Sequence, residues 1–230
     1  MNKLQGKLQL KIPTDTWVTA SWDDYVNATA NSDYQKAKCY YYSGQLRIEM
    51  PPVGANHADD NNIVAVLISL FGVVRNLPIR GFTNCSYRRV GIKECQPDIS
   101  YYIGDRVQFS PQGSSIVDLD LTHPPDLAIE VADSSWADDI GKKRLLYEEL
   151  GIAEYWVVDV RNTRILAFTI ANNGSYRIDR SQVLPELSIV LLEQALQRSR
   201  QTDNSQVGNW FITQIQDSAL ILPNLGFKAD

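Results

Sequence analysis

Two carboxylates, Asp98 and Glu130, lie in segments whose residues alternate as they do in β-strands. A period of two places Glu130 on one face with Asp126, Ala128 and Ala132, and aliphatic residues on the other. A carboxylate among apolar neighbours is costly to bury unless it is paired or binds a cation. Two carboxylates on adjacent strands, with a backbone carbonyl between them, form an oxygen-rich site for Mg²⁺, which can activate water and neutralise phosphate charge. The residue types leave a second interpretation open, a salt bridge between Glu130 and an Arg or Lys of the next element.

A lysine follows Glu130 on a segment with helical spacing. Asp139, Lys143 and Tyr147 fall at i, i+4 and i+8, so they share one helix face. Lys143 could point back to the end of the strand, where it would orient a water molecule or stabilise a phosphate, with Asp139 in a supporting role. On spacing alone, an ordinary Asp–Lys surface pair is the favoured interpretation.

The elements that must position these residues follow from periodicity and turn signals. Lys38–Met50 has the pattern of a hairpin turning at Ser43-Gly44, and a helix with Asn56 as N-cap follows it. The strand containing Glu130, a helix ended by Gly151 and a strand over 153–160 form a βαβ unit with parallel strands. The remaining expectations are strands over 81–89 and 94–103, a loop over 104–125, hairpin strands over 165–170 and 176–178 at one end of the sheet, and a polar, mobile segment over 197–206.

Composition limits the class of protein. The 230 residues are 44% hydrophobic and 21% charged, with a net charge of −5, which excludes a mainly disordered, collagen-like or coiled-coil chain. The longest apolar run, 63–74, is too short to cross a membrane, and the N-terminus lacks a signal-peptide pattern. Three cysteines without a CxxC pair are typical of reduced thiols, so we expect a cytoplasmic protein without membrane association.

Several short motifs occur in a fixed order. They are GQLRIEMPP over 44–52, His57 at a helix start, Pro97-Asp98, PDLAIEV over 125–131, D-x-x-x-K-R-x-x-Y over 139–147 and G-I-x-E-Y-W-V-V-D over 151–159. This order resembles a large bacterial family of putative restriction endonucleases with a PD-(D/E)XK nuclease core. The resemblance covers about residues 17–195, and 125–159 is its most specific part.

The resemblance implies a role for individual residues. Asp98 and Glu130 would be the acidic metal ligands, and the carbonyl of Val131 would complete the site. The usual lysine of the superfamily would fall at Ala132, so the resemblance moves this role to Lys143. Glu49 and His57 would border the same cleft in supporting roles. For His57 the alternative is a helix-cap histidine bonded to backbone, and Tyr147 and Trp156 are expected in the core.

These observations predict an α/β fold with a restriction-endonuclease-like core, in which helices flank a central mixed sheet and a β-hairpin is added. Residues 1–196 would form this domain and 197–230 a C-terminal extension. The predicted function is a metal-dependent endonuclease that uses Mg²⁺ (or Mn²⁺) to hydrolyse phosphodiester bonds in DNA. A homodimer is expected from the resemblance alone.

Two other functions remain open. One is a catalytically weak or inactive nuclease-fold protein acting in binding or assembly, which Ala132 and the acidic net charge favour. The other is metal-dependent hydrolysis of another phosphoester. The catalytic hypothesis requires the Lys143 ammonium within about 8 Å of the Glu130 carboxylate, the range of direct or one-water contact.

Overall fold

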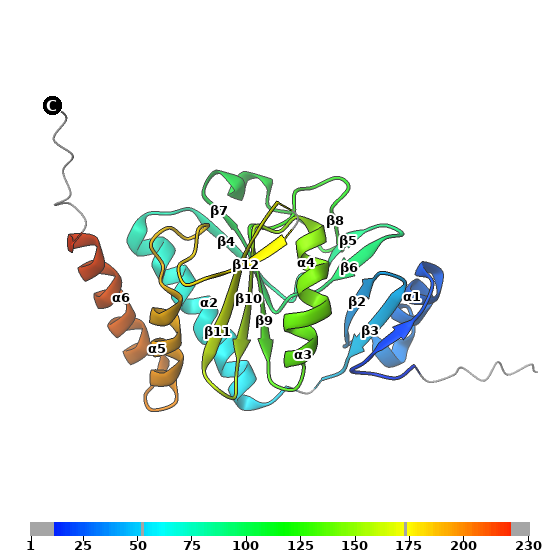
Figure 1. Cartoon of the computed structure of the whole chain (residues 1–230), viewed down its shortest axis with the longest axis horizontal. Coiled ribbons are helices and arrows are strands. Elements are labelled where there is room, and N and C mark those ends of the chain that lie inside the picture. Colours follow the sequence, from blue (N-terminus) through cyan, green and yellow to red (C-terminus); the bar gives the residue numbers. More distant parts are fainter. Residues whose placement is uncertain (1–11, 52, 173, 222–230) are drawn as a thin grey trace, which may run out of the picture.

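The computed structural model describes residues 12–51, 53–172 and 174–221, and it shows an α/β fold with two mixed sheets (Figure 1). The central sheet has the strand order β12-β11-β10-β9-β7-β4. Only β9 and β10 are parallel neighbours in it. Its strands are β4 (Ile79–Thr83), β7 (Ile99–Ile103), β9 (Leu127–Ala132), β10 (Glu154–Asp159), β11 (Arg164–Ala171) and β12 (Gly174–Ile178).

A second sheet, here called the N-terminal sheet, has the order β1-β3-β2-β6-β5-β8. Its strands are β1 (Trp17–Thr19), β2 (Lys38–Tyr42), β3 (Gln45–Glu49), β5 (Tyr87–Arg89), β6 (Lys93–Cys95) and β8 (Val117–Asp118). The predicted hairpin is confirmed as β2–β3, with Ser43 and Gly44 at positive φ in its turn. This hairpin is part of a whole second sheet, which the sequence pattern did not indicate.

Different elements cover the two faces of the central sheet. One face packs on α2 (Ala55–Arg75), α5 (Ile189–Ser199) and α6 (Asn204–Ile221) through a large aliphatic core. The other face packs on α4 (Arg144–Leu150) and the tyrosine-rich side of the N-terminal sheet. Helix α1 (Trp22–Thr29) covers the outer side of that sheet. Figure 1 shows this layered order from α6 at one end to α1 at the other. Short 3₁₀ turns, η1 (Ser32–Tyr34) and η2 (Gly104–Phe109), complete the elements outside the βαβ unit.

The βαβ unit is confirmed. Strands β9 and β10 are parallel, with Glu130 opposite Val157, and Gly151 ends the intervening helix at φ 77°. The helix itself is irregular: α3 (Trp136–Asp138) and α4 are joined by a π-helical turn, η3 (Asp139–Lys143). Such wide turns change the direction in which side chains leave a helix and are frequent at functional sites.

Two predicted strands each divide into two strands that belong to different sheets. The first part of segment 81–89 belongs to β4 of the central sheet, and its last part is β5 of the N-terminal sheet. Asn84, at φ 52°, lies in the break. Segment 94–103 divides likewise into β6 and β7 around Pro97, which has no N–H to donate to a ladder. The chain therefore passes from one sheet to the other within each of these two segments, which helps to join the sheets.

The helix boundaries also differ from the expectations. Helix α2 begins at Ala55 with Gly54 as N-cap, two residues before the expected N-cap, Asn56. Within segment 197–206, α5 continues to Ser199 and α6 begins at Asn204. A boundary at 196/197 falls inside α5, and Val207, Phe211 and Ile215 of α6 are buried in the core with α2. Residues 222–230 lie outside the described residues. Within the described part of the chain, no helix is long and apolar enough to span a membrane.

Candidate active site

Asp98 and Glu130 lie close together at the end of two neighbouring antiparallel strands. Asp98 directly precedes β7, whose register pairs Ile99 with Ile129 of β9, so Asp98 lies beside Glu130 where the ladder ends. Residues opposite each other in such a ladder project from the same face, with Cβ atoms about 5 Å apart. The N–H of Val131 donates to Asp98 Oδ2 at 2.8 Å and fixes this carboxylate against β9. The structure thus brings together all three predicted metal-site residues.

Glu130 is almost completely buried and is held by tyrosines. Its side chain is 2% exposed, and Oε1 accepts hydrogen bonds from Tyr40 at 3.0 Å and from Tyr147 at 2.6 Å. Burial raises the pKa of Glu130 to about 8, with the Asp98 charge adding to the rise and the Lys143 charge opposing it. Tyr147 is a core residue as expected, and it also contacts the candidate site.

Lys143 lies among three carboxylates. Its Nζ is 2.8 Å from Glu49 Oε1, 2.8 Å from Asp139 Oδ1 and 3.7 Å from Glu130 Oε1. The last distance is well inside the range that the catalytic hypothesis requires. The side chain is 1% exposed, so the Asp139–Lys143 pair is a buried one and the surface-pair interpretation is wrong. Burial lowers the pKa of Lys143, but the three carboxylates outweigh it and raise the pKa overall.

Glu49 and Asp139 are both bonded to groups besides Lys143. Arg47 donates from Nε to Glu49 Oε1 at 2.7 Å, and Ser135 donates to Asp139 Oδ2 at 2.5 Å. Burial raises the pKa of Glu49, yet the Lys143 and Arg47 charges lower it overall. For Asp139, burial dominates and the pKa is raised. The η3 turn sets the position of Lys143, and the Tyr155 hydroxyl donates to the Asp139 carbonyl of this turn at 2.9 Å.

His57 on α2 and Lys38 on β2 both lie close to Asp98. Lys38 Nζ donates to Asp98 Oδ1, and His57 Nε2 lies 3.9 Å from Asp98 Oδ2. Burial raises the pKa of Asp98, but the Lys38 ammonium and the Val131 N–H lower it overall. His57 is in the first turn of α2 without forming a side-chain cap, so the helix-cap interpretation does not hold.

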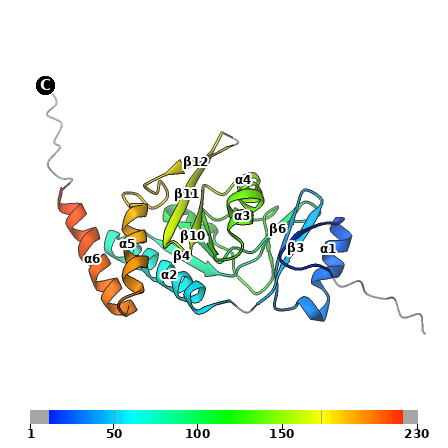
Figure 2. The ribbon, with the colours of Figure 1, turned by 60° about the horizontal axis from the view of Figure 1, so that its bottom comes forward.

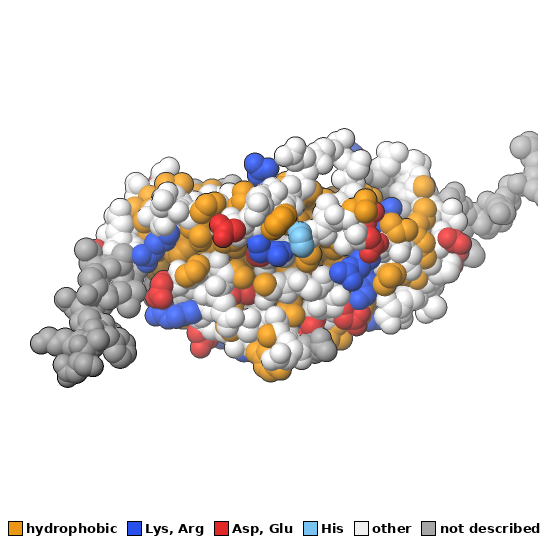
Figure 3. All heavy atoms as spheres, turned by 90° about the horizontal axis from the view of Figure 1, so that it is seen from above, with side chains coloured by type: hydrophobic (Ala, Val, Ile, Leu, Met, Phe, Trp, Pro, Cys, Tyr) orange, Lys and Arg blue, Asp and Glu red, His pale blue; other side chains and the backbone are white. Residues whose placement is uncertain are grey.

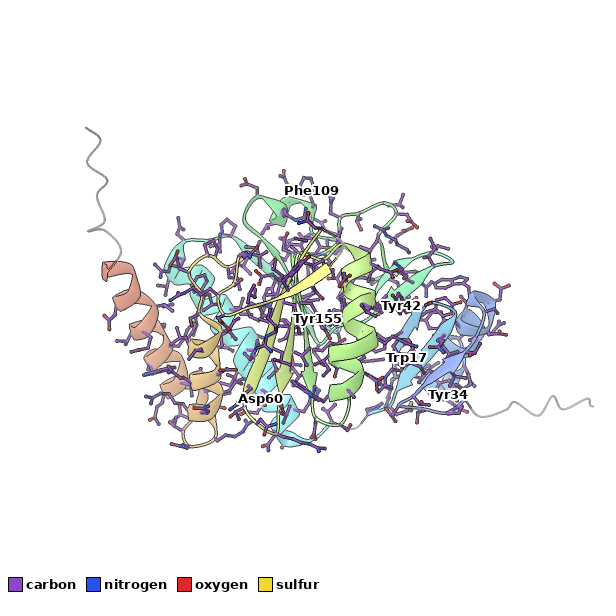
Figure 4. The ribbon with its side chains drawn as sticks, in the orientation of Figure 1. Trp17, Tyr34, Tyr42, Asp60, Phe109 and Tyr155 are labelled. Carbon is purple, nitrogen blue, oxygen red and sulfur yellow. The ribbon has the colours of Figure 1, made fainter. Side chains whose placement is uncertain are left out.

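One face of the β2–β3 hairpin supplies much of the site, and the sequence interpretation assigned only Glu49 of this face. Lys38 lies opposite Glu49 and Tyr40 opposite Arg47. Side chains of this face form hydrogen bonds and ion pairs with the rest of the chain: Lys38 with Asp98, Tyr40 with Glu130, Tyr42 with Glu149, Gln45 with Lys142, Arg47 with Asp138 and Glu49 with Lys143. The available signal was the alternation within each strand, K-x-Y-x-Y over 38–42 and Q-x-R-x-E over 45–49. Tyr42 and Trp17 lie between the hairpin and the α3–α4 helix in Figure 4, and Figure 2 shows the hairpin beside α3.

The candidate site opens into a cavity of about 270 Å³, whose lining includes Lys38, Glu49, His57, Asp98, Glu130, Val131 and Lys143. Met50 and Val53 are exposed apolar residues at its rim, and Ser134 and Ser135 line the side next to β9. Among the described residues, no group of three or more His, Cys, Asp or Glu side chains is arranged to hold a metal ion. Asp98 and Glu130 can still supply two carboxylate oxygens, which with a backbone carbonyl and water suit Mg²⁺ or Mn²⁺. The donor set therefore fits a hard divalent cation.

Comparison with known proteins gives the family and the fold of the chain. The family model Uma2, described as putative restriction endonuclease, matches residues 22–205. A solved structure, a putative nuclease belonging to DUF820 from Anabaena variabilis ATCC 29413, is similar with a TM-score of 0.53 and 19% identity, over 76% of this chain and 98% of that chain. At this identity the likeness concerns the fold, and no match was found among curated proteins. Since the family model covers most of the chain and the solved structure shares its fold, the chain belongs to the Uma2 family of putative restriction endonucleases.

Proposed function

We propose that the protein is a metal-dependent endonuclease that hydrolyses phosphodiester bonds in DNA with Mg²⁺ or Mn²⁺. One observation supports this proposal most. In a member of a nuclease family, Asp98 and Glu130 lie close together and both line the same cavity. The cation would be held by these two carboxylates and the Val131 carbonyl. Bound there, it would lower the pKa of a water molecule and neutralise charge on the phosphate.

The chain's own residues keep the carboxylates in place for this task. Asp98, whose pKa is lowered overall, is ionised at neutral pH. Tyr40 and Tyr147 both donate to Oε1 of Glu130, which fixes the orientation of the carboxylate and leaves Oε2 for a ligand. The positive charge of Lys143 balances the negative charges of the carboxylates around it, Glu49, Asp139 and Glu130. A preorganised set of this kind needs little rearrangement when charge develops on the substrate.

A second candidate function is binding or assembly without catalysis. It is favoured by the burial of Lys143, which is 1% exposed and bonded to Glu49 and Asp139, and by Ala132 at the usual lysine position. A lysine held in this way cannot reach out to a substrate without leaving its carboxylates. The two candidates differ in one measurable property, cleavage of DNA.

The test compares wild type with the double variant Asp98→Ala, Glu130→Ala. Mg²⁺ and Mn²⁺ are titrated calorimetrically into both, and plasmid cleavage is measured on the same samples. The nuclease proposal expects metal binding and metal-dependent nicking by wild type and loss of both in the variant. Asp23→Ala, Asp179→Ala is the matched control, since it removes the same charge from exposed positions outside the cavity. Site-dependent metal binding without cleavage of any substrate would support the binding function instead.

A homodimer and a cytoplasmic location are further proposals that rest on the resemblance and on the reduced cysteines. A dimer would let two sites cut the two strands of one duplex. Sedimentation velocity across a range of protein concentrations would measure the oligomeric state, and a single monomer-sized species with cleavage activity would contradict the dimer.

A further inference from the structure

We propose that Lys38, and not Lys143, is the lysine that contacts the substrate phosphate. This inference rests on the proposed nuclease function. Lys38 is the first residue of β2, its side chain is 21% exposed, and it lines the cavity while its ammonium donates to Asp98 Oδ1. It therefore combines a position at the carboxylate pair with access to a ligand in the cavity.

Lys143 differs from Lys38 in its burial and in its partners. Lys143 is 1% exposed and is bonded to Glu49 and Asp139, both at 2.8 Å. Removing its ammonium from this place would leave buried carboxylates without a counter-charge, which costs several kcal/mol. Lys143 is thus a fixed counter-ion that holds the site together, and it lacks freedom to follow a substrate.

The other basic residues of the cavity do not fill this role. Arg47 is 3% exposed and is engaged by Glu49 and Asp138. Lys36 is exposed at the cavity lining, and none of its contacts with the described residues places it at Asp98 or Glu130. On the face seen in Figure 3, basic and acidic side chains of the described residues are interspersed. Lys38 is therefore the cavity cation best placed to meet a phosphate at the carboxylate pair.

The partner of Lys38 explains how it would change roles. Without a ligand its ammonium balances Asp98 and keeps this carboxylate ionised. A divalent cation bound to Asp98 weakens this contact, because like charges repel. The flexible four-carbon stem of Lys38 then allows the ammonium to turn to the nearest anion in the cavity, the phosphodiester. Lys38 would thus compete with the metal and assist the substrate.

The test follows from these opposite effects. Lys38→Gln, Lys38→Arg and the control Arg164→Gln, an exposed residue outside the cavity, are compared with wild type by calorimetric Mn²⁺ titration and by cleavage of a fluorescein-labelled DNA duplex. Lys38→Gln is expected to bind Mn²⁺ about tenfold more tightly, because a competing charge is removed. Its kcat/KM is expected to fall about 10²–10³-fold, because a phosphate contact is lost. Lys38→Arg should recover part of the cleavage, and Arg164→Gln should match wild type in both measurements.

The outcomes separate this proposal from the nuclease function itself. If wild type cleaves the duplex and Lys38→Gln keeps its kcat/KM and Mn²⁺ affinity within about twofold, Lys38 has no such role and the proposal is overturned while the nuclease function stands. The same holds if Lys38→Gln loses cleavage only through weaker Mn²⁺ binding. If wild type does not cleave, the nuclease function fails and the Lys38 proposal fails with it.

Discussion

Lys38 and Glu49 lie opposite each other at the open end of the β2–β3 hairpin, yet their charged groups bond to different partners. Lys38 donates to Asp98 next to the central sheet, and Glu49 accepts from Lys143 on the η3 turn at 2.8 Å. A cross-strand Lys–Glu pair would ordinarily bond to itself and be worth less than about 1 kcal/mol. Here both side chains join the N-terminal sheet to the βαβ unit, so the hairpin forms one wall of the candidate site.

The first prediction concerns Lys143 as a structural counter-ion. Lys143→Met keeps the volume of the side chain but leaves Glu49, Asp139 and Glu130 without their shared cation. Breaking a buried ion pair in this way costs about 3–5 kcal/mol of unfolding free energy. Urea denaturation of the metal-free protein measures the loss. Arg161→Gln breaks the exposed Arg161–Asp133 pair and should leave the urea midpoint unchanged. A Lys143→Met variant as stable as wild type would contradict the counter-ion role.

The second prediction concerns the pH dependence of stability. The folded-state pKa of Glu130 is raised from 4.5 to about 8, mainly by burial. Between these values the folded state holds a proton that the unfolded state releases, so the contribution of Glu130 to stability is present below pH 4.5 and is lost as pH rises to 8. Glu130→Gln mimics the protonated form. Its unfolding free energy relative to wild type should therefore rise between pH 5 and pH 8.5, by at least the ~1.4 kcal/mol that one pKa unit represents.

Denaturation of the metal-free proteins at several pH values measures this difference. Glu186→Gln, at an exposed position, is the control and should follow wild type at every pH. A constant difference between Glu130→Gln and wild type across the range would mean that Glu130 titrates at the same pH in the folded and unfolded chain.

The sequence predicted the central part of the fold because its signals are local. Alternation over 126–132 places Glu130 on one face of β9, and Gly151 ends the following helix, as the structure confirms. The sequence placed Asp98 and Glu130 at strand positions and offered them as a candidate pair, while their role as metal ligands came from the family resemblance. The N-terminal sheet could not be predicted in the same way, because β2 and β6 meet through a single residue pair, Tyr41 with Glu94, far apart in the chain.

The part of the site that sequence reasoning missed depends on docking between distant elements. A period of two shows that Lys38, Tyr40, Arg47 and Glu49 share a face of the hairpin, but it does not show what that face meets. The burial of Lys143 depends likewise on the η3 turn, for which the periodic pattern of a regular helix gives no signal. The polar composition of 197–206 likewise gives no signal for the end of α5 at Ser199 or the start of α6 at Asn204.

The third prediction concerns the C-terminal helices as part of the core. Phe211 is completely buried where α6 packs on α2, and Arg200 donates to the buried Asp60 of α2 at 2.7 Å. Asp60 lies on the α2 side in Figure 4. Phe211→Ala should therefore cost about 3–5 kcal/mol of unfolding free energy in urea denaturation. Phe109→Ala, at a residue 43% exposed, is the matched control and should cost less than about 1 kcal/mol. Equal losses for the two variants would show that α6 adds little to the core.

The last prediction separates two roles of Tyr147, packing and contact with the candidate site. Its ring is completely buried and stacks on Tyr155, while its hydroxyl donates to Glu130 Oε1 at 2.6 Å. Tyr147→Phe removes only the hydroxyl, and a hydrogen bond to a charged group is worth about 1.5–3 kcal/mol. In a double-mutant cycle with Glu130→Gln, the coupling energy should be larger above pH 8, where Glu130 is ionised, than at pH 5. If the coupling is the same at both pH values, Tyr147 acts through packing alone, because only a contact with the charged carboxylate changes when Glu130 loses its proton.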